Sequence, residues 1–353
     1  MTQRHDRRGP FIALASAALF GASAPLAKGL LASITPQLLA GLLYAGSGCG
    51  LAVYRFAKRA RAEAPLGRAD MPWLAGAIAF GGVAGPLLLM IGLTRTPASG
   101  ASLLLNLEGV FTALLAWFVF HENVDRRIAL GMLAIVAGGI VLTWQGRAEW
   151  GGIAGPLAIA GACACWATDN NLTQKVSGGD PVQIAMLKGL VAGSVNVGIA
   201  AALGARMPPA GPLAGALVVG LFSYGVSLVL FVRALRYLGT ARTGAYFSTA
   251  PFVGAALSVI VFREHVTIGF LTAAALMLAG VWLHLTERHE HEHHHAAMDH
   301  DHAHVHDEHH QHEHGPDDPA VTDPRPHTHA HHHAPLTHTH PHYPDLHHRH
   351  THE

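Results

Sequence analysis

Val119-Phe120-His121-Glu122-Asn123-Val124 and Val261-Phe262-Arg263-Glu264-His265-Val266, which lies 142 residues further on, are two copies of one pattern, and each closes an apolar stretch. The same shift places Gly138 on Gly280. The chain is therefore a duplication. Each half holds five apolar stretches, and because five is an odd number the second half must cross a membrane in the opposite sense to the first. Inverted repeats of this kind are characteristic of secondary transporters.

The apolar stretches fill residues 11–285, and each is long enough to span a bilayer as a helix. We therefore predict an all-α membrane protein with ten transmembrane helices in two inverted five-helix repeats. The predicted divisions are an N-terminus (1–10), a first repeat (11–145), a second repeat (152–285) and a tail (286–353). The predicted spans are 11–31, 37–56, 73–93, 97–120, 127–145, 152–174, 182–203, 212–233, 241–262 and 267–285.

The distribution of charge predicts the orientation. With the N-terminus in the cytoplasm, the segments on that side carry fifteen Lys and Arg residues and the opposite ones five. This is the bias of the positive-inside rule, and an even number of spans puts the tail in the cytoplasm as well. We expect a bacterial inner (plasma) membrane. The whole chain has 23 basic and 23 acidic residues, so it has no basic excess that would favour a nucleic-acid partner.

The end of the second copy resembles a known family. An alanine-rich helix there carries Pro251 thirteen residues before Glu264, and with the span count and the duplication this is similar to drug/metabolite transporters with two EamA-type domains. The resemblance covers about residues 11–285. It implies alternating access without ATP, a central cavity between the repeats and no enzymatic activity; the family's substrates include amino acids, sugars, drugs and some metals. In the first half Gly109 replaces the proline, which puts a proline-dependent bend of the fourth span in doubt.

Charged groups at membrane depth are rare because removing them from water is unfavourable, so each is a candidate for transport or coupling. Glu108 lies near the middle of the fourth span, two residues after Asn106. Its carboxyl group can hold a proton, a cationic solute or a metal. The alternative is structural: Glu108 bonds to Asn106 or to a facing helix and keeps the two halves in register.

A second group of candidates lies on spans six and seven. Asp169 and Lys188 are placed to form an ion pair between these antiparallel helices, and Asn170 adds an amide beside them. The pair is either a gate that opens when a solute or proton competes for Asp169, or a lock that only joins two helices. No catalytic residue and no required cofactor is predicted.

Several aromatic residues could line the cavity, although packing explains most aromatic residues in a bilayer. Glycines at positions 81, 82 and 85 allow helices to approach closely. The aromatic candidates are Tyr44, Trp166, Tyr224 and Tyr246.

The tail holds 25 histidines in 68 residues and few apolar residues, so it is expected to be disordered without a ligand. Neutral imidazoles suit nickel, cobalt and zinc ions. The tail could bind such ions in the cell, or it could be a low-complexity extension with incidental affinity. The leading candidate ligands are His289, His291, His293, His294, His295, His300, His302, His304 and His306.

Three functions remain open at this point. The leading hypothesis is efflux of divalent nickel or cobalt, with the tail capturing the ion. The second is export of a metabolite, amino acid or drug, with the tail as a metal buffer or regulator. The third is a metal-sensing membrane protein that transports nothing, against which the clear inverted repeat argues. The expected partners are the lipid bilayer and a small solute or divalent metal, and a homodimer through glycine-rich faces is an open alternative.

Overall fold

The structure is a computed structural model that describes most of the chain. The described residues are 8–58, 66–120, 126–143, 150–176, 179–234, 246–285, 290–295, 298–304, 327–333 and 336–341.

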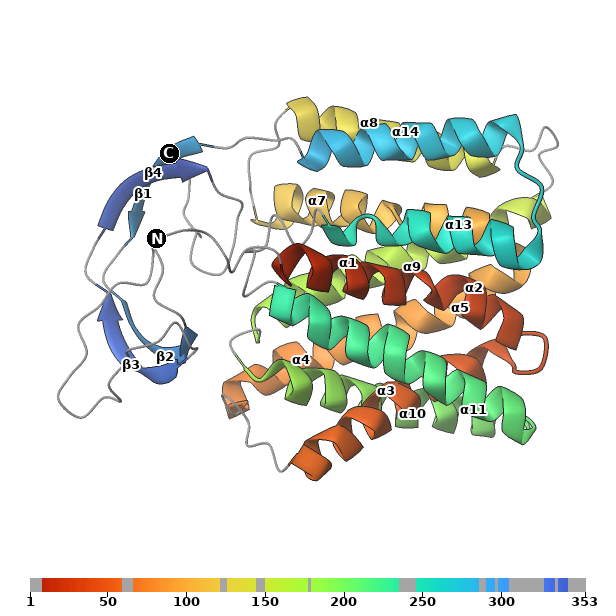
Figure 1. Cartoon of the computed structure of the whole chain (residues 1–353), viewed down its shortest axis with the longest axis horizontal. Helices are drawn as coiled ribbons and strands as arrows, with labels where there is room; N and C mark the ends of the chain where they lie inside the picture. Colours follow the sequence, from red (N-terminus) through yellow and green to blue (C-terminus); the bar gives the residue numbers. More distant parts are fainter. Residues whose placement is uncertain are drawn as a thin grey trace.

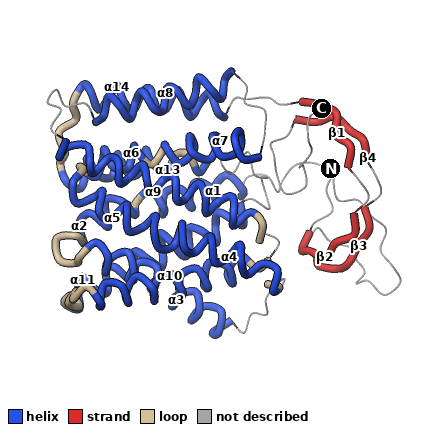
Figure 2. Tube along the Cα trace, turned by 180° about the vertical axis from the view of Figure 1, so that it is seen from behind, coloured by secondary structure: helices blue, strands red, loops and turns tan. Residues whose placement is uncertain are grey.

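The described residues up to 285 form the helical bundle of Figure 1, and all of its elements are helices (Figure 2). In the first half they are α1 (Arg8–Gly21), α2 (Ser23–Leu30), α3 (Pro36–Lys58), η1 (Arg68–Asp70), α4 (Met71–Ala77), η2 (Ile78–Ala84), α5 (Gly85–Arg95), α6 (Ala98–Leu104), α7 (Leu107–Phe120) and α8 (Arg126–Thr143). In the second half they are α9 (Trp150–Gln174), α10 (Pro181–Ala202), α11 (Ala210–Val219), η3 (Gly220–Val226), α13 (Ala250–Phe262) and α14 (Ile268–Leu285).

The outside of the bundle is apolar. Phe11, Phe56 and Ile268 are 75%, 79% and 85% exposed, whereas a soluble protein rarely shows a continuous surface of this kind. Five helical segments have the length and composition to cross a membrane, and three shorter apolar helices accompany them. These features and the element order confirm the predicted all-α membrane fold. The five long segments are Gly9–Leu30, Pro36–Ala57, Arg68–Arg95, Pro181–Ala202 and Ala210–Ala234.

The two halves pack as an inverted pair. Equivalent helices lie against one another: α3 packs along α10 at one edge of the bundle, and α8 packs along α14 at the other (Figure 1). The glycines that match in sequence make this second contact. A Cβ on Gly138 would lie 2.9 Å from the oxygen of Ala273, and one on Gly280 would lie 2.6 Å from the oxygen of Gly131. Both contacts depend on the absence of a side chain.

Two π-helical segments also follow the repeat. η2 in the third span and η3 in the eighth begin 142 residues apart, which is the sequence shift itself. A π-helical turn widens the helix and is frequent at functional sites. Neither segment was foreseen in the sequence, where residues 81, 82 and 85 indicated only close packing.

The fourth span is broken between α6 and α7 at Leu105–Asn106, and the ninth has a turn at Ser248–Thr249 just before α13. Pro251 stands in the first turn of α13, where proline fits without loss of a helical hydrogen bond. The break in the fourth span forms with Gly109 in place of that proline. The fourth span is therefore interrupted without the proline.

One short connection is held from both sides by charged residues. The carboxylate of Glu264 accepts hydrogen bonds from the backbone N–H groups of Ala98 (2.9 Å) and Ser99 (3.1 Å), the first residues of α6, and from the Ser99 hydroxyl. The Lys28 ammonium donates to the carbonyl oxygens of Leu93 and of Thr96, the latter at 3.0 Å, at the end of α5. Each charge satisfies helix-end groups that have no partner within their own helix.

Four short strands lie beyond the end of the bundle at which α1 begins (Figure 1). β1 (Glu290–His295) pairs antiparallel with β4 (Leu336–Pro341), and β2 (Met298–His304) pairs with β3 (His327–His333). That the tail is disordered without a ligand stays a prediction. Histidine alternates in these strands with Thr, Asp or Ala over much of the length, a pattern compatible with extended chain, and pairing satisfies the backbone N–H and C=O groups.

Candidate functional site

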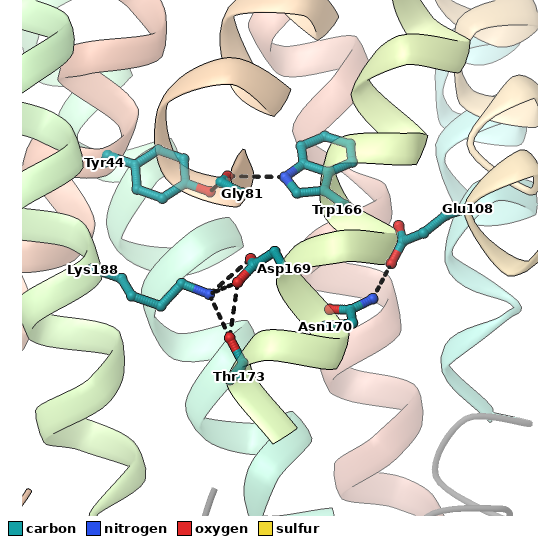
Figure 3. A network of polar contacts seen from close by, with 8 residues as sticks. All are labelled: Tyr44, Gly81, Glu108, Trp166, Asp169, Asn170, Thr173 and Lys188. Atoms are coloured by element: carbon teal, nitrogen blue, oxygen red, sulfur yellow. Dashed lines mark hydrogen bonds and ion pairs between the residues drawn. The ribbon is translucent and has the colours of Figure 1, made fainter. Parts of the chain in front are cut away.

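The helix α9 contributes several polar side chains to the site. Over two turns α9 presents Trp166, Asp169, Asn170 and Thr173 to three different neighbours, as Figure 3 shows. Asp169 and Thr173 lie on one face because they are four residues apart, and Asn170 lies on the adjacent face. Consecutive residues of one helix thus reach opposite sides of the site.

Asp169 and Lys188 form a buried ion pair between α9 and α10. The ammonium nitrogen lies 2.6 Å from Oδ1 and 2.7 Å from Oδ2 of the carboxylate. The Thr173 hydroxyl donates to Oδ1 of Asp169 at 2.8 Å and accepts from Lys188 at 3.2 Å. Asp169 is 6% exposed and Lys188 7%, so each charge depends on the other for compensation in a medium of low dielectric constant.

Glu108 lies in the first turn of α7, directly after the break in the fourth span. Its Oε1 accepts a hydrogen bond of 2.7 Å from the amide of Asn170, which joins the two repeats (Figure 3). The N-terminal turn of a helix favours an anion. The donor in this bond is the neutral amide of Asn170, whereas the donor to Asp169 is the charged ammonium of Lys188. The carboxylate is half-buried and remains open to a proton or to a cationic group.

The widened segment η2 offers backbone oxygens to side chains from three other helices. The Gly81 oxygen accepts from the Tyr44 hydroxyl at 2.7 Å and from the Trp166 indole nitrogen at 3.0 Å (Figure 3). The Gly82 oxygen accepts from the Asn196 amide at 2.9 Å. Gly81 also has no room for a side chain, because a Cβ there would lie 1.9 Å from Oδ2 of Asp169. The glycine thus lets the backbone meet the ion pair.

Aromatic rings from both repeats meet in the middle of the bundle. Phe20 contacts the rings of Trp166, Tyr224 and Phe247 at centroid distances of 6.2, 6.1 and 5.4 Å, and Tyr44 contacts Tyr224 at 5.3 Å. We call these five residues the aromatic cluster. Tyr44, Trp166 and Tyr224 are all more than nine-tenths buried, so they do not act as anchors at the membrane surface.

The structure brings together four of the five residues that the sequence named for transport. Asp169, Lys188, Asn170 and Glu108 lie in one network. Asn106 lies apart from it: its amide donates to the Leu103 oxygen at 2.9 Å, at the break of its own span, and lies 4.0 Å from the Met277 sulfur. The bond from Asn106 to Glu108 considered above is thus replaced by a bond from a facing helix.

Two parts of the network were missed in the sequence. Gly81 is a double acceptor within a π-helical turn that the sequence analysis did not predict, and the contacts of Thr173 with Asp169 and Lys188 were not predicted either. The run Phe80-Gly81-Gly82 aligns with Phe222-Ser223-Tyr224 of the other repeat, but this alignment does not distinguish a π-helical turn from close packing.

The candidate metal ligands lie in the tail. His289 and His306 fall outside the described residues, and the other seven belong to β1 and β2, of which the structure describes the backbone course. Within the described side chains, no group of three or more His, Cys, Asp or Glu is arranged to hold a metal ion. Metal binding by the tail stays a prediction.

Comparison with known proteins identifies relatives over nearly the whole bundle. The model of the EamA-like transporter family matches twice, at residues 7–144 and 153–286. An uncharacterized transporter of Methanothermobacter thermautotrophicus is 30% identical over 293 residues, which is 77% of this chain and 85% of that protein.

Two further matches are more limited. A probable 4-amino-4-deoxy-L-arabinose-phosphoundecaprenol flippase subunit ArnE of Pseudomonas aeruginosa is 43% identical over 75 residues, 21% of this chain and 63% of that protein. A crystal structure that covers 79% of this chain and 98% of its own is 17% identical with a TM-score of 0.60, so it shares the fold.

Proposed function

The chain belongs to the EamA-like transporter family, and on that premise we propose that it exports a small organic solute by alternating access of its two repeats. A solute site between inverted repeats, built where helices are interrupted, is the arrangement common to many secondary transporters. Here the polar network and the aromatic cluster take Glu108 from the interrupted fourth span, Gly81 and Tyr224 from the widened η2 and η3, and Phe247 from just before the turn that precedes α13.

The observation that carries this proposal is the contrast between two carboxylates. Asp169 is compensated by Lys188 at 2.6 Å, whereas Glu108 accepts from the neutral amide of Asn170 at 2.7 Å. The described network therefore holds two carboxylates and one ammonium. A proton or a cationic group on Glu108 would balance it.

Exchange of these two partners on Glu108 would couple transport to a proton gradient. When Glu108 is protonated its bond to Asn170, which links α7 to α9, loses its ionic character and weakens. When a cationic group binds, the carboxylate is ionised again. Because this contact joins one repeat to the other, its strength affects how easily the two repeats move relative to each other.

An organic cargo also agrees with the match to ArnE, whose name gives a lipid-linked amino sugar as its substrate. Transition-metal transport asks for several N, O or S ligands around one point, and the described helices offer no cluster of three.

Metal efflux remains the second candidate because of one observation, the 25 histidines of the tail. In that case the tail would capture nickel or cobalt and deliver it to the bundle.

The tail would have to lie in the cytoplasm to do this. Fifteen basic residues on one side of the membrane against five on the other support a cytoplasmic tail in a bacterial inner membrane. Fluorescence of a green fluorescent protein fused after the tail reports this side, and a dark, correctly inserted fusion would refute it.

The decisive experiment compares cells that carry the wild-type chain, Glu108→Gln, or no chain. Organic solutes in the medium are profiled by mass spectrometry, and cellular nickel, cobalt and zinc are measured in the same cultures. We expect one or more organic solutes to accumulate outside wild-type cells only, with metal contents unchanged. Lower metal content with the wild-type chain would favour the second candidate instead.

The matched control is Glu264→Gln, the same change at a carboxylate that caps α6 and lies outside the network. It should export normally once its amount in the membrane is taken into account. Full export by Glu108→Gln would remove this carboxylate from the mechanism.

A further inference from the structure

Two buried hydroxyl groups at the aromatic cluster have no use in the network described above. Ser23 is 1% exposed and Tyr224 8%, and neither hydroxyl oxygen has a hydrogen-bond partner among the described residues. A buried polar group without a partner lowers the stability of the folded state, and such groups are rare enough in native proteins to need an explanation.

The two hydroxyls face the same region. The hydroxyl groups of Tyr224 and Ser23 are close enough to interact with each other, and neither makes a geometrically well-formed hydrogen bond with any described residue. A hydroxyl oxygen has two acceptor lone pairs. Even a close pair of hydroxyls therefore has acceptor capacity left over, which a donor from a bound molecule can use.

The surroundings of these oxygens are aromatic. The ring of Tyr224 lies 5.3 Å from that of Tyr44 and 6.1 Å from that of Phe20 between ring centroids, and Phe20 continues the contact to Phe247 at 5.4 Å. The faces of aromatic rings carry partial negative charge and attract cations. Acceptor oxygens beside such faces suit a group that has both N–H donors and positive charge.

The two hydroxyl groups come from different repeats. Tyr224 belongs to η3 and Ser23 is the first residue of α2, directly after the turn at Ala22, so the first repeat supplies one hydroxyl and the second repeat the other. In the other repeat the place of Tyr224 is taken by Gly82, whose oxygen is bonded to Asn196. The backbone oxygens of Gly81 and Gly82 in η2 are thus used by side chains of the protein, whereas the Tyr224 hydroxyl of η3 is left without a well-formed hydrogen bond to a described residue.

We infer that Ser23 and Tyr224 bind the protonated amine of the solute, and that the aromatic cluster receives its ring-sized apolar body. The inference rests on the proposed function and names its substrate class: a small primary ammonium compound with an aromatic or alicyclic ring. The ammonium donates to the two hydroxyl oxygens. The excess carboxylate of the network favours a cation over an organic anion, because the interior screens charge weakly. The rings contact one another in this structure, so the solute binds only when they separate.

The test measures binding to the full chain purified in detergent. The probe is phenethylamine, a ring with a protonated primary amine. Two analogues distinguish the contributions of the charge and of the N–H donors. 2-Phenylethanol is neutral, and phenethyltrimethylammonium keeps the charge and the ring but has no N–H donor. Affinities are measured by isothermal titration calorimetry for wild type, Ser23→Ala and Tyr224→Phe. Tyr54→Phe is the matched control, because Tyr54 is 45% exposed on α3.

We expect wild type to bind phenethylamine more tightly than 2-phenylethanol. Tyr224→Phe should weaken the binding of phenethylamine about three- to tenfold, which is the effect of one hydrogen bond. The same variant should leave the affinity for phenethyltrimethylammonium unchanged. The same variant without ligand should melt at the same or a higher temperature, because an unpartnered hydroxyl is removed. Tyr54→Phe should behave as wild type in every measurement.

Two results would overturn the inference. One is a Tyr224→Phe variant that binds phenethylamine as wild type does but melts at a lower temperature, since its hydroxyl would then serve the structure alone. The other is a wild type that binds none of the three probes, or binds the neutral one equally well. Neither result touches the proposed function, which is judged by solute export and by Glu108→Gln.

Discussion

Single residues inside the bundle are constrained by charge as much as by shape. Lys188 is the clearest case, because its ammonium is buried and directed at Asp169. Lys188→Met leaves the carboxylate buried without its partner, and the expected loss is about 3–5 kcal/mol in the free energy of unfolding. Adding Asp169→Asn removes the remaining charge and should restore most of the loss. SDS titration of purified protein, followed by circular dichroism, measures both; equal stability of the single and double variants would contradict the reasoning.

The same ion pair limits position 81. A Cβ at Gly81 would lie 1.9 Å from Oδ2 of Asp169, so Gly81→Ala must displace the carboxylate and should lower stability and export together. Gly109→Ala is the control within the fourth span, since nothing lies within 4 Å of its Cβ position. Alanine there should stabilise the helix by about 0.5–1 kcal/mol. Melting temperatures of the two variants should therefore move in opposite directions, and a common direction would refute the contact.

Among the elements, α6 depends on a residue far away in the chain. Glu264 accepts from the N–H groups of Ala98 and Ser99, which have no partner within their own helix. Glu264→Ala should lower the free energy of unfolding by about 1–2 kcal/mol, as the loss of a helix cap does. Glu264→Gln keeps an acceptor oxygen and should lose less. SDS titration gives the order, and an alanine variant as stable as wild type would deny the cap any role.

The elements also show how far a sequence can be interpreted. The ten spans, the inversion of the second half and the pairing of Asp169 with Lys188 could be predicted, because length, charge and helical spacing are local properties. The capping role of Glu264 could not, although the residue marked the repeat, since its partners lie 165 and 166 positions away. The π-helical turns and the Gly81 contacts also escaped, because no residue pattern distinguishes a widened turn from a glycine that only packs.

At the scale of the whole molecule, the described tail strands pair with each other in the order β1 with β4 and β2 with β3. We therefore expect truncation after Leu285 to leave the melting temperature of the bundle unchanged and, under the organic-solute proposal, to leave export unchanged. The truncated and full chains are compared in the same detergent with and without nickel. A nickel-dependent rise in melting temperature for the full chain alone would show that the tail acts on the bundle through metal.

The contact between Glu264 and the other repeat has a consequence for the evolution of the protein. Glu264, which follows α13 in the second repeat, completes a helix of the first, so neither repeat alone contains both partners of this contact. A half-length ancestor carrying the same residue would have met its counterpart only on a second copy inserted upside down. Duplication and fusion of such a gene would have turned an encounter between two separately made chains into a permanent one, and freed the two copies to diverge.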